Sequence, residues 1–496
     1  MDQLATLLLG FPPAGGFASL EDYHSQAKSH HQSLDKLAST SNFRQSAANL
    51  LEHVDPAVNS MSYLALLNTA INTGSAPLPD LLAKASVFLC TFDPQQTRYS
   101  GKALSSLLEW ALSGTSFPAS VAVDVVATAL LRLDPMGSVL TSHHVALAKL
   151  ALDTDNIIPA LPLLDKSIVS YPGIKSTQDP RPLCSPDLPP AAYIAIETGL
   201  TKSLTSTDVL QYDLIRGLCY IQLKDWHKAH DALEHVVTYP ARDNHSCSKI
   251  MVEAHNKWLL VGLLRTGKTP ELPPTTAPGA QKAFTTLGKP YHAIAKAFED
   301  GSAAALRTEF ETIGPAFFSE ENNLTLVHLV LQHFQRWQIL NLRHVYTAVS
   351  LEQIRQRTHN AMTAAPLATE EEVEQLLRQM MEDGMLRGVV ERPADGPAYL
   401  RFLDDDEGGP TDGGGLSEAE FARRMQAAAE RLRELAPLVR ATSDRLGSSR
   451  EYIKYVVEQQ KRDLDGRGRA GAMDDATPFM SQIEDEDLMT GVVTGY

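Results

Sequence analysis

The sequence predicts an all-α helical-repeat (TPR-like) solenoid, followed by a winged-helix subdomain and then by C-terminal helices. Apolar residues recur at helical spacing through most of the first 340 residues, with little alternation of period two. Two capped helices and two strand-like runs then occupy Ser350 to Leu403. Three-four apolar spacing returns after Phe421. We expect these regions: 1–165 N-terminal helical repeats, 166–209 a Pro-rich loop and connecting segment, 210–335 further helices, 336–403 a winged helix, 416–462 C-terminal helices and 463–496 a disordered acidic tail.

The N-terminal half contains amphipathic stripes separated by short polar segments. Met61, Leu64, Leu67 and Ile71 form one stripe, and an apolar run ending at Leu133 forms another. Residues 172–190 contain several prolines, which cannot continue a helix, so this stretch predicts a loop.

Residues 210–240 resemble a tetratricopeptide hairpin. Gly217 and Tyr220 stand three apart, Ala229 and Leu233 follow, and Pro240 ends the pattern. Small residues let two antiparallel helices approach each other, and large ones fill the space between them. A single hairpin cannot bury its apolar face, so we expect neighbouring helical pairs in 251–264, 291–298 and 323–335.

The segment from Ile339 to Leu403 has the order of a winged helix. Ile339, Leu342, Tyr346 and Val349 predict a first helix. Ser350 and Thr369 are N-caps for two more helices, and Gly384 suits the left-handed residue that ends the last of them. The runs 385–392 and 398–403 predict two strands around a Pro- and Gly-containing turn.

The charges of this winged helix argue against nucleic-acid recognition. Its third helix, the usual reader of DNA, carries six acidic residues against the single Arg378. Affinity for nucleic acid comes largely from neutralising phosphates, so this face would repel a duplex. A free strand edge in the wing can instead pair with another protein. The residues predicted for such an interaction are Met385, Arg387, Val389 and Glu391.

After Phe421 the chain predicts a helix with one apolar seam, suited to packing against partner helices or back on its own solenoid. Pro437 lies within it and is expected to kink or split it. The seam residues predicted to interact are Phe421, Met425, Leu432, Leu435, Val439 and Leu446.

The composition predicts a cytoplasmic or nuclear protein. The 496 residues carry a formal net charge of −16, which disfavours a general affinity for nucleic acid or anionic membranes. No apolar run is long enough to span a membrane, and the N-terminus lacks a signal-peptide pattern. The four cysteines are widely spaced, as expected for reduced thiols.

The sequence contains one segment with the spacing of a nucleotide-binding motif. Gly262–Thr269 has the P-loop spacing, but its preceding residues are helical and prolines follow it, whereas a P-loop needs a strand before it and a helix after it. The histidine pairs His30–His31, His143–His144 and His227–His230 lack converging ligands, so we expect ordinary surface or hydrogen-bonded histidines. The sequence therefore predicts no enzyme, no cofactor and no metal.

Four segments carry a resemblance to a known family: Leu287–Ala295, Glu321–Leu324, Val349–Ile354 and Gln379–Met385. With the solenoid, the winged helix and the terminal helix, they resemble the PCI-domain family, and within it the subunits of the COP9 signalosome. The resemblance extends from about Tyr212 to Val457 and is thin before that.

This resemblance implies a non-catalytic scaffold. The signalosome removes a ubiquitin-like modifier from the cullins of cullin-RING ligases (deneddylation), and a different subunit holds the metalloprotease. PCI subunits pack by the sheet edges of their winged helices and gather their terminal helices in one bundle. The implied neighbours are subunits 1 and 8. Two alternatives stay open: a PCI subunit of the proteasome lid, and a PCI adaptor in a nucleic-acid or messenger RNA export complex.

Overall fold

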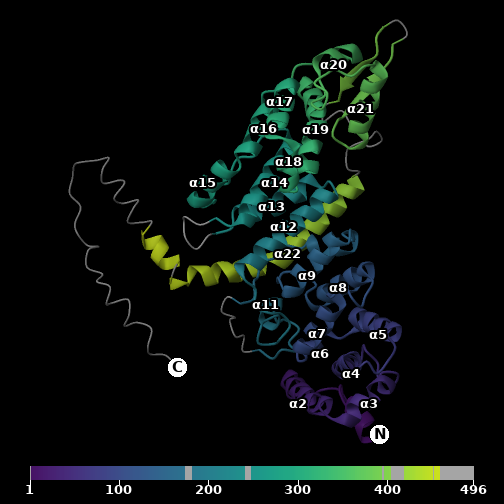
Figure 1. Cartoon of the computed structure of the whole chain (residues 1–496). Helices are drawn as coiled ribbons and strands as arrows, with labels where there is room; N and C mark the ends of the chain where they lie inside the picture. Colours follow the sequence, from purple (N-terminus) through teal and green to yellow (C-terminus); the bar gives the residue numbers. More distant parts are fainter. Residues whose placement is uncertain are drawn as a thin grey trace, which may run out of the picture. The chain divides into compact units, whose positions relative to one another are not determined.

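A computed structural model describes residues 2–173, 181–240, 247–393, 396–403, 418–450 and 452–458, which fall into two compact units, 1–420 and 421–496. The first unit is a stack of helices that ends in a small three-stranded sheet (Figure 1). None of the helices in the described ranges is long and apolar enough to cross a membrane. The predicted acidic tail, 463–496, lies outside the described residues.

The N-terminal part of the first unit is entirely helical in its regular elements, as expected. Its helices bury one face each in a core that includes Leu64, Leu104 and Val126. The elements are α1 Asp2–Leu8, α2 Leu20–Ala38, α3 Ser41–Leu50, α4 Ser60–Thr73, α5 Leu78–Thr91, α6 Pro94–Thr97, α7 Gly101–Leu112, α8 Ala119–Leu133, α9 Ser142–Asp153, the 3₁₀ turn η1 Ile158–Ala160 and α10 Leu161–Leu164.

The described part of the Pro-rich segment is mostly irregular, with the short helix α11 Pro190–Tyr193, but it is packed into the N-terminal helices. Arg98 donates to the carbonyl oxygens of Leu183 (2.7 Å) and Ser185 (3.1 Å), and its guanidinium lies 3.7 Å from the centre of the Tyr193 ring. The Tyr193 hydroxyl donates to the Leu133 carbonyl at 2.7 Å. Composition predicted a connecting segment, and these long-range bonds make it part of the helical core.

The predicted hairpin is present as α12 Ser206–Gln222 and α13 Trp226–Val237. A Cβ at Gly217 would lie 2.9 Å from the Leu233 side chain, so glycine permits this close helix approach. The stack continues through α14 Lys249–Thr266, α15 Pro278–Leu287, α16 Lys289–Glu299, α17 Ala303–Ile313, α18 Pro315–Glu320 and α19 Leu324–Leu342. Figure 1 shows these helices stacked between the N-terminal helices and the end that carries α20 (Leu351–Arg357) and α21 (Glu370–Glu382).

Helix α19 joins the two hydrophobic cores of the first unit. Val330 and Phe334 belong to the core of the helical stack, and Ile339 belongs to the core of the winged helix. The expected boundary at 335–336 therefore lies inside one continuous helix. The winged helix comprises β1 Ala348–Ser350, α20 Leu351–Arg357, α21 Glu370–Glu382, β2 Gly388–Glu391 and β3 Tyr399–Phe402.

Two sequence-based details need correction. Val349 lies in β1, where it pairs with Leu400, and the preceding helix ends at Leu342, so the prediction of a helix through Val349 was wrong. Helix α22 Glu418–Gly447 runs through Pro437 as one helix, so of the two expected outcomes, a kink or a split, the split does not occur. A proline removes one backbone hydrogen bond, and this 30-residue helix tolerates the loss. Residues 452–458 are also helical.

Candidate protein-interaction surfaces

The winged-helix sheet has the order β1-β3-β2, which leaves β2 at one edge. All pairs are antiparallel, with Val389 opposite Arg401 and Glu391 opposite Tyr399. Leu400 and Phe402 on β3 point into the small core with Val373 and Leu377 of α21. An edge strand presents backbone groups that can pair with another strand.

The four wing residues predicted to interact lie on or just before this edge strand. Val389 is 41% exposed, and Arg387 is also exposed. Met385 is half-buried against the winged-helix core. Glu391 accepts hydrogen bonds from the Tyr399 hydroxyl and from Arg401 Nε (2.8 Å). Val389 and Arg387 are therefore accessible, whereas Met385 and Glu391 mainly stabilise the wing.

Glu374, one of the six acidic residues of the third helix, has a structural role. Glu374 of α21 is only 8% exposed and accepts hydrogen bonds from Arg378 (2.6 Å) and from Arg392 at the end of the wing strand. Burial acts to raise the pKa of Glu374, but the two guanidinium groups outweigh it, so the pKa lies below its usual range. Glu374 thus ties the third helix to the wing.

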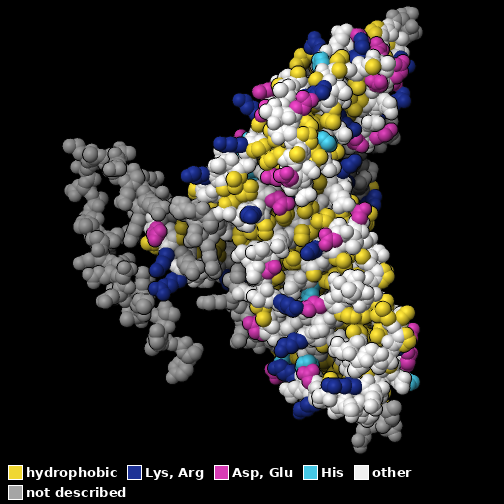
Figure 2. All heavy atoms as spheres, viewed as in Figure 1, with side chains coloured by type: hydrophobic (Ala, Val, Ile, Leu, Met, Phe, Trp, Pro, Cys, Tyr) yellow, Lys and Arg dark blue, Asp and Glu magenta, His cyan; other side chains and the backbone are white. Residues whose placement is uncertain are grey.

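The remaining charges of α21 still disfavour a nucleic-acid interface. Glu370, Glu371 and Glu382 are exposed, and the exposed Arg378 is paired with Glu374. Figure 2 shows Lys and Arg side chains interspersed with Asp and Glu over the visible face of the described residues, without a continuous basic surface in that view. Phosphate binding requires such a surface.

In the second unit, α22 brings the predicted seam residues onto one side of a helix. Phe421, Met425, Val439 and Leu446 are each more than half exposed, Leu432 is 70% exposed, and Leu435 is partly exposed. These are large apolar side chains, and no other described helix of this unit except the short 452–458 segment is available to cover them. An uncovered apolar stripe of this kind marks a packing surface.

The P-loop-like segment is a helix end, as its flanking residues predicted. Gly262 lies inside α14, and Gly267 ends that helix in the left-handed conformation with φ +68°. A Cβ at Gly262 would lie 2.6 Å from the Pro270 ring, and one at Gly267 would lie 2.6 Å from the Trp337 ring. Both glycines allow close packing, so the segment has no phosphate-binding geometry.

We therefore predict that Gly262→Val lowers the free energy of unfolding by about 2 kcal/mol, because the new side chain overpacks the contact with Pro270. The change Lys268→Ala, at an exposed side chain, should alter it by less than about 0.5 kcal/mol. Chemical denaturation measures both values. Calorimetry should find no ATP binding to the wild-type chain, and an ATP affinity abolished by Lys268→Ala would contradict this interpretation.

One of the histidine pairs, His143 and His144, is held by hydrogen bonds inside the fold. Among the described residues there is no group of three or more His, Cys, Asp or Glu side chains that could hold a metal ion. His143 is hydrogen-bonded to Ser105 Oγ (3.1 Å), and His144 Nδ1 to Thr141 Oγ1 (2.8 Å). Burial lowers the pKa of His143 to about 4 and of His144 to about 3. Both are neutral structural residues at the start of α9.

Because these two histidines are buried, we expect the folded protein to lose stability in acid. Their unfolded-state pKa is about 6.5, so below that pH the unfolded chain binds protons that the folded chain excludes. The melting temperature should be steady above pH 7 and fall as pH drops from 6.5 towards 4. Replacing His143, which also faces Glu109 and Lys202, with glutamine should make this fall shallower. The exposed His53→Gln is the control and should leave the profile unchanged.

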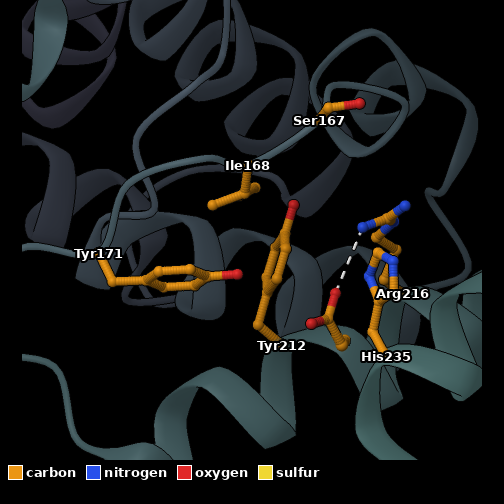
Figure 3. Close-up of a pocket in the computed structure, with 7 residues that line it drawn as sticks. Ser167, Ile168, Tyr171, Tyr212, Arg216 and His235 are labelled. Carbon is orange, nitrogen blue, oxygen red and sulfur yellow. Dashed lines mark hydrogen bonds and ion pairs between the residues drawn. The ribbon is translucent and has the colours of Figure 1, made fainter. Parts of the chain in front are cut away.

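A small polar cavity of about 70 Å³ lies beside the α12–α13 hairpin (Figure 3). Arg216 Nη1 lies 3.3 Å from Asp213 Oδ1, and burial raises the pKa of that carboxyl group. Among the described residues, the buried Tyr212 hydroxyl and Arg216 Nε have no hydrogen-bond partner. Ordered water in a cavity of this size can provide one. Figure 3 shows Ser167 across the cavity from His235, so no serine–histidine pair forms here.

Two of the segments that resemble the PCI family meet in a buried network. Lys257 Nζ of α14 donates to Asn323 Oδ1 (2.8 Å), and Asn323 Nδ2 donates to the Tyr291 hydroxyl (2.6 Å). Tyr291 of α16 in turn donates to Glu321 Oε2 (2.6 Å). Asn322 adopts a left-handed conformation in the turn that brings Glu321 and Asn323 together. These motif residues therefore join three parts of the stack.

A helical-repeat stack that runs into a winged helix through one helix, together with a separate apolar terminal helix, has the architecture of a PCI-type subunit. Comparison with known proteins shows to which family of PCI-type subunits the chain belongs. The family model for the N-terminal helical repeats of COP9 signalosome complex subunit 3 matches residues 18–278, more than half of the chain. The chain belongs to the COP9 signalosome complex subunit 3 family.

Relatives in fungi and plants carry that same name. The chain is 44% identical to COP9 signalosome complex subunit 3 of Neurospora crassa, over 99% of each chain. It is 29% identical to the Emericella nidulans protein of that name, over 88% of this chain and 89% of the relative. For the Arabidopsis thaliana protein the identity is 27%, over 51% of this chain and 55% of the relative.

Proposed function

We propose that this chain is a non-catalytic scaffold subunit of the COP9 signalosome, acting in the cytoplasm and nucleus. In this role it supports deneddylation of cullin-RING ligases by holding other subunits in place. The uncovered apolar seam of α22 carries the proposal, because such a surface needs a partner helix. The accessible β2 edge of the wing provides a second, independent contact.

The two surfaces suit different partners. Backbone pairing at β2 favours the winged helix of a neighbouring PCI subunit, for which subunits 1 and 8 are the candidates. The seam of α22 favours a bundle that collects helices from many subunits. Neither surface has the charge needed for nucleic acid or an anionic membrane, and contact with cullin-RING ligases would be indirect.

Affinity purification of the endogenously tagged protein, followed by native mass measurement of the eluate, tests the proposal. We expect a complex of fixed stoichiometry that contains other PCI subunits and a metalloprotease subunit. Co-purification of proteasome components would instead assign the chain to the proteasome lid. A monomer, or a particle containing RNA, would refute the scaffold role.

A further inference from the structure

A pocket of about 290 Å³ lies where the helical stack meets the winged helix. Its walls come from the ends of α14 and α16 and from the C-terminal half of α19. The volume is near the lower limit of roughly 300 Å³ for small-molecule sites, so it suits one long side chain better than a nucleotide or cofactor.

The inner walls of the pocket are aromatic. Phe298 and Phe334 form an edge-to-face pair with ring centres 5.2 Å apart, and both are nearly buried. The Trp337 ring is held against Gly267, and Trp337 Nε1 is buried without a hydrogen-bond partner among the described residues. These walls would accept an aliphatic stem, and an aromatic face can also lie against a cation.

Two helix ends place partial negative charge at the rim of the pocket. Helices α14 and α16 both point their C-terminal ends, which carry partial negative charge, towards it. Glu299 is held in place because its Oε1 accepts the Thr269 backbone N–H at 2.6 Å, and among the described residues its Oε2 has no partner. The lining residues include one carboxylate, that of Glu299, and one cation, that of Lys268.

Hydrogen bonds of one rim residue, Gln338, also connect the helical stack to the winged helix. Gln338 Nε2 donates to the Gly301 carbonyl at 3.0 Å, and Gln338 Oε1 accepts the His359 backbone N–H at 2.8 Å. One side chain thus links the turn after α16 to the loop after α20. A braced pocket needs little reorganisation to bind, which favours affinity.

We propose that this pocket receives a long cationic side chain, arginine or lysine, from a segment of a partner protein. The aliphatic stem packs between the aromatic walls, and the charged head lies over Trp337 and bonds to Glu299 Oε2. The inference rests on the proposed scaffold function, because it requires a protein partner.

Site-specific photo-crosslinking in the assembled complex tests the proposal. A benzophenone amino acid at Asn341, an exposed residue on the rim, should crosslink to another subunit in a peptide that contains arginine or lysine. Glu299→Gln keeps the acceptor for Thr269 but removes the charge, so it should lower the crosslink yield about tenfold. The matched control is Glu320→Gln, because Glu320 is also an exposed glutamate at the end of a helix.

The outcomes separate this inference from the proposed function. Crosslinks only to this chain's own residues around Lys268, a partner peptide without a cationic residue, or equal yields from Glu299→Gln and the wild type would each overturn the pocket assignment. In those cases the complex itself still forms, as native mass measured before irradiation would show. Failure of the wild-type chain to enter any such complex would refute the scaffold function.

Discussion

Replacing Leu432 and Leu435 with aspartate should release the chain from its complex without unfolding residues 2–403. Both leucines lie on the apolar seam of α22, and Leu432 is 70% exposed. Burial of a leucine contributes about 1.5–3 kcal/mol, so losing both contacts should weaken assembly by more than roughly a hundredfold. Co-purification with the other subunits measures assembly, and thermal melting of the isolated chain measures its fold.

A control with the same charges on another face of α22 makes this prediction specific. Gln426 and Ala441 are exposed and lie away from the seam on a helical projection. Aspartate at both positions should leave assembly intact. If the seam variant instead lowers the helicity and melting temperature of the isolated chain, the helix packs on its own chain, and the partner-bundle proposal is wrong.

Replacing Asn323 with leucine should produce the second large effect, a loss of about 3 kcal/mol in the free energy of unfolding. Asn323 is 1% exposed and bonds to both Lys257 and Tyr291. Leucine has a similar size but no polar side-chain atoms. Among the described residues, the buried Lys257 ammonium would then keep only Glu253 (3.0 Å) as a partner. An under-paired buried charge and a buried tyrosine hydroxyl without its donor are both costly.

Chemical denaturation of the isolated chain measures this loss. Asn42→Leu, at an exposed asparagine of α3, is the control and should change stability by less than about 0.5 kcal/mol. Equal stability of the Asn323 variant and the wild type would show that the network contributes nothing. The motif residues Tyr291 and Asn323 would then need another explanation.

The winged helix shows which features could be predicted from local sequence. Thr369 caps α21 by accepting the Glu372 N–H, and Gly384 follows the helix end with φ +69°. Both features depend on residues within a few positions, so their pattern was readable. Strand β1 was missed because it has only three residues and exists through pairing with β3, about fifty residues later. No local pattern records such pairing.

The candidate interaction surfaces were also predicted from local sequence patterns. The seam of α22 follows from three-four spacing, which any continuous helix places on one side, and the structure keeps these side chains exposed. The wing residues were harder, because alternation along a strand does not reveal which side chains bond across it. Glu391 is tied to Tyr399 and Arg401, and Glu374 is tied to Arg392.

By itself the sequence determined the helical class, the helix caps, the apolar seam and the membership in a PCI-type family. Only the tertiary structure decided that Gly262 and Gly267 are packing glycines and that 181–205 belongs to the N-terminal core. It also decided that the ends of α14 and α16 and the C-terminal half of α19 enclose a pocket. Periodicity and capping arise from neighbours within one or two helical turns. Burial, ion pairing and cavities depend on distant residues that only the folded chain brings together.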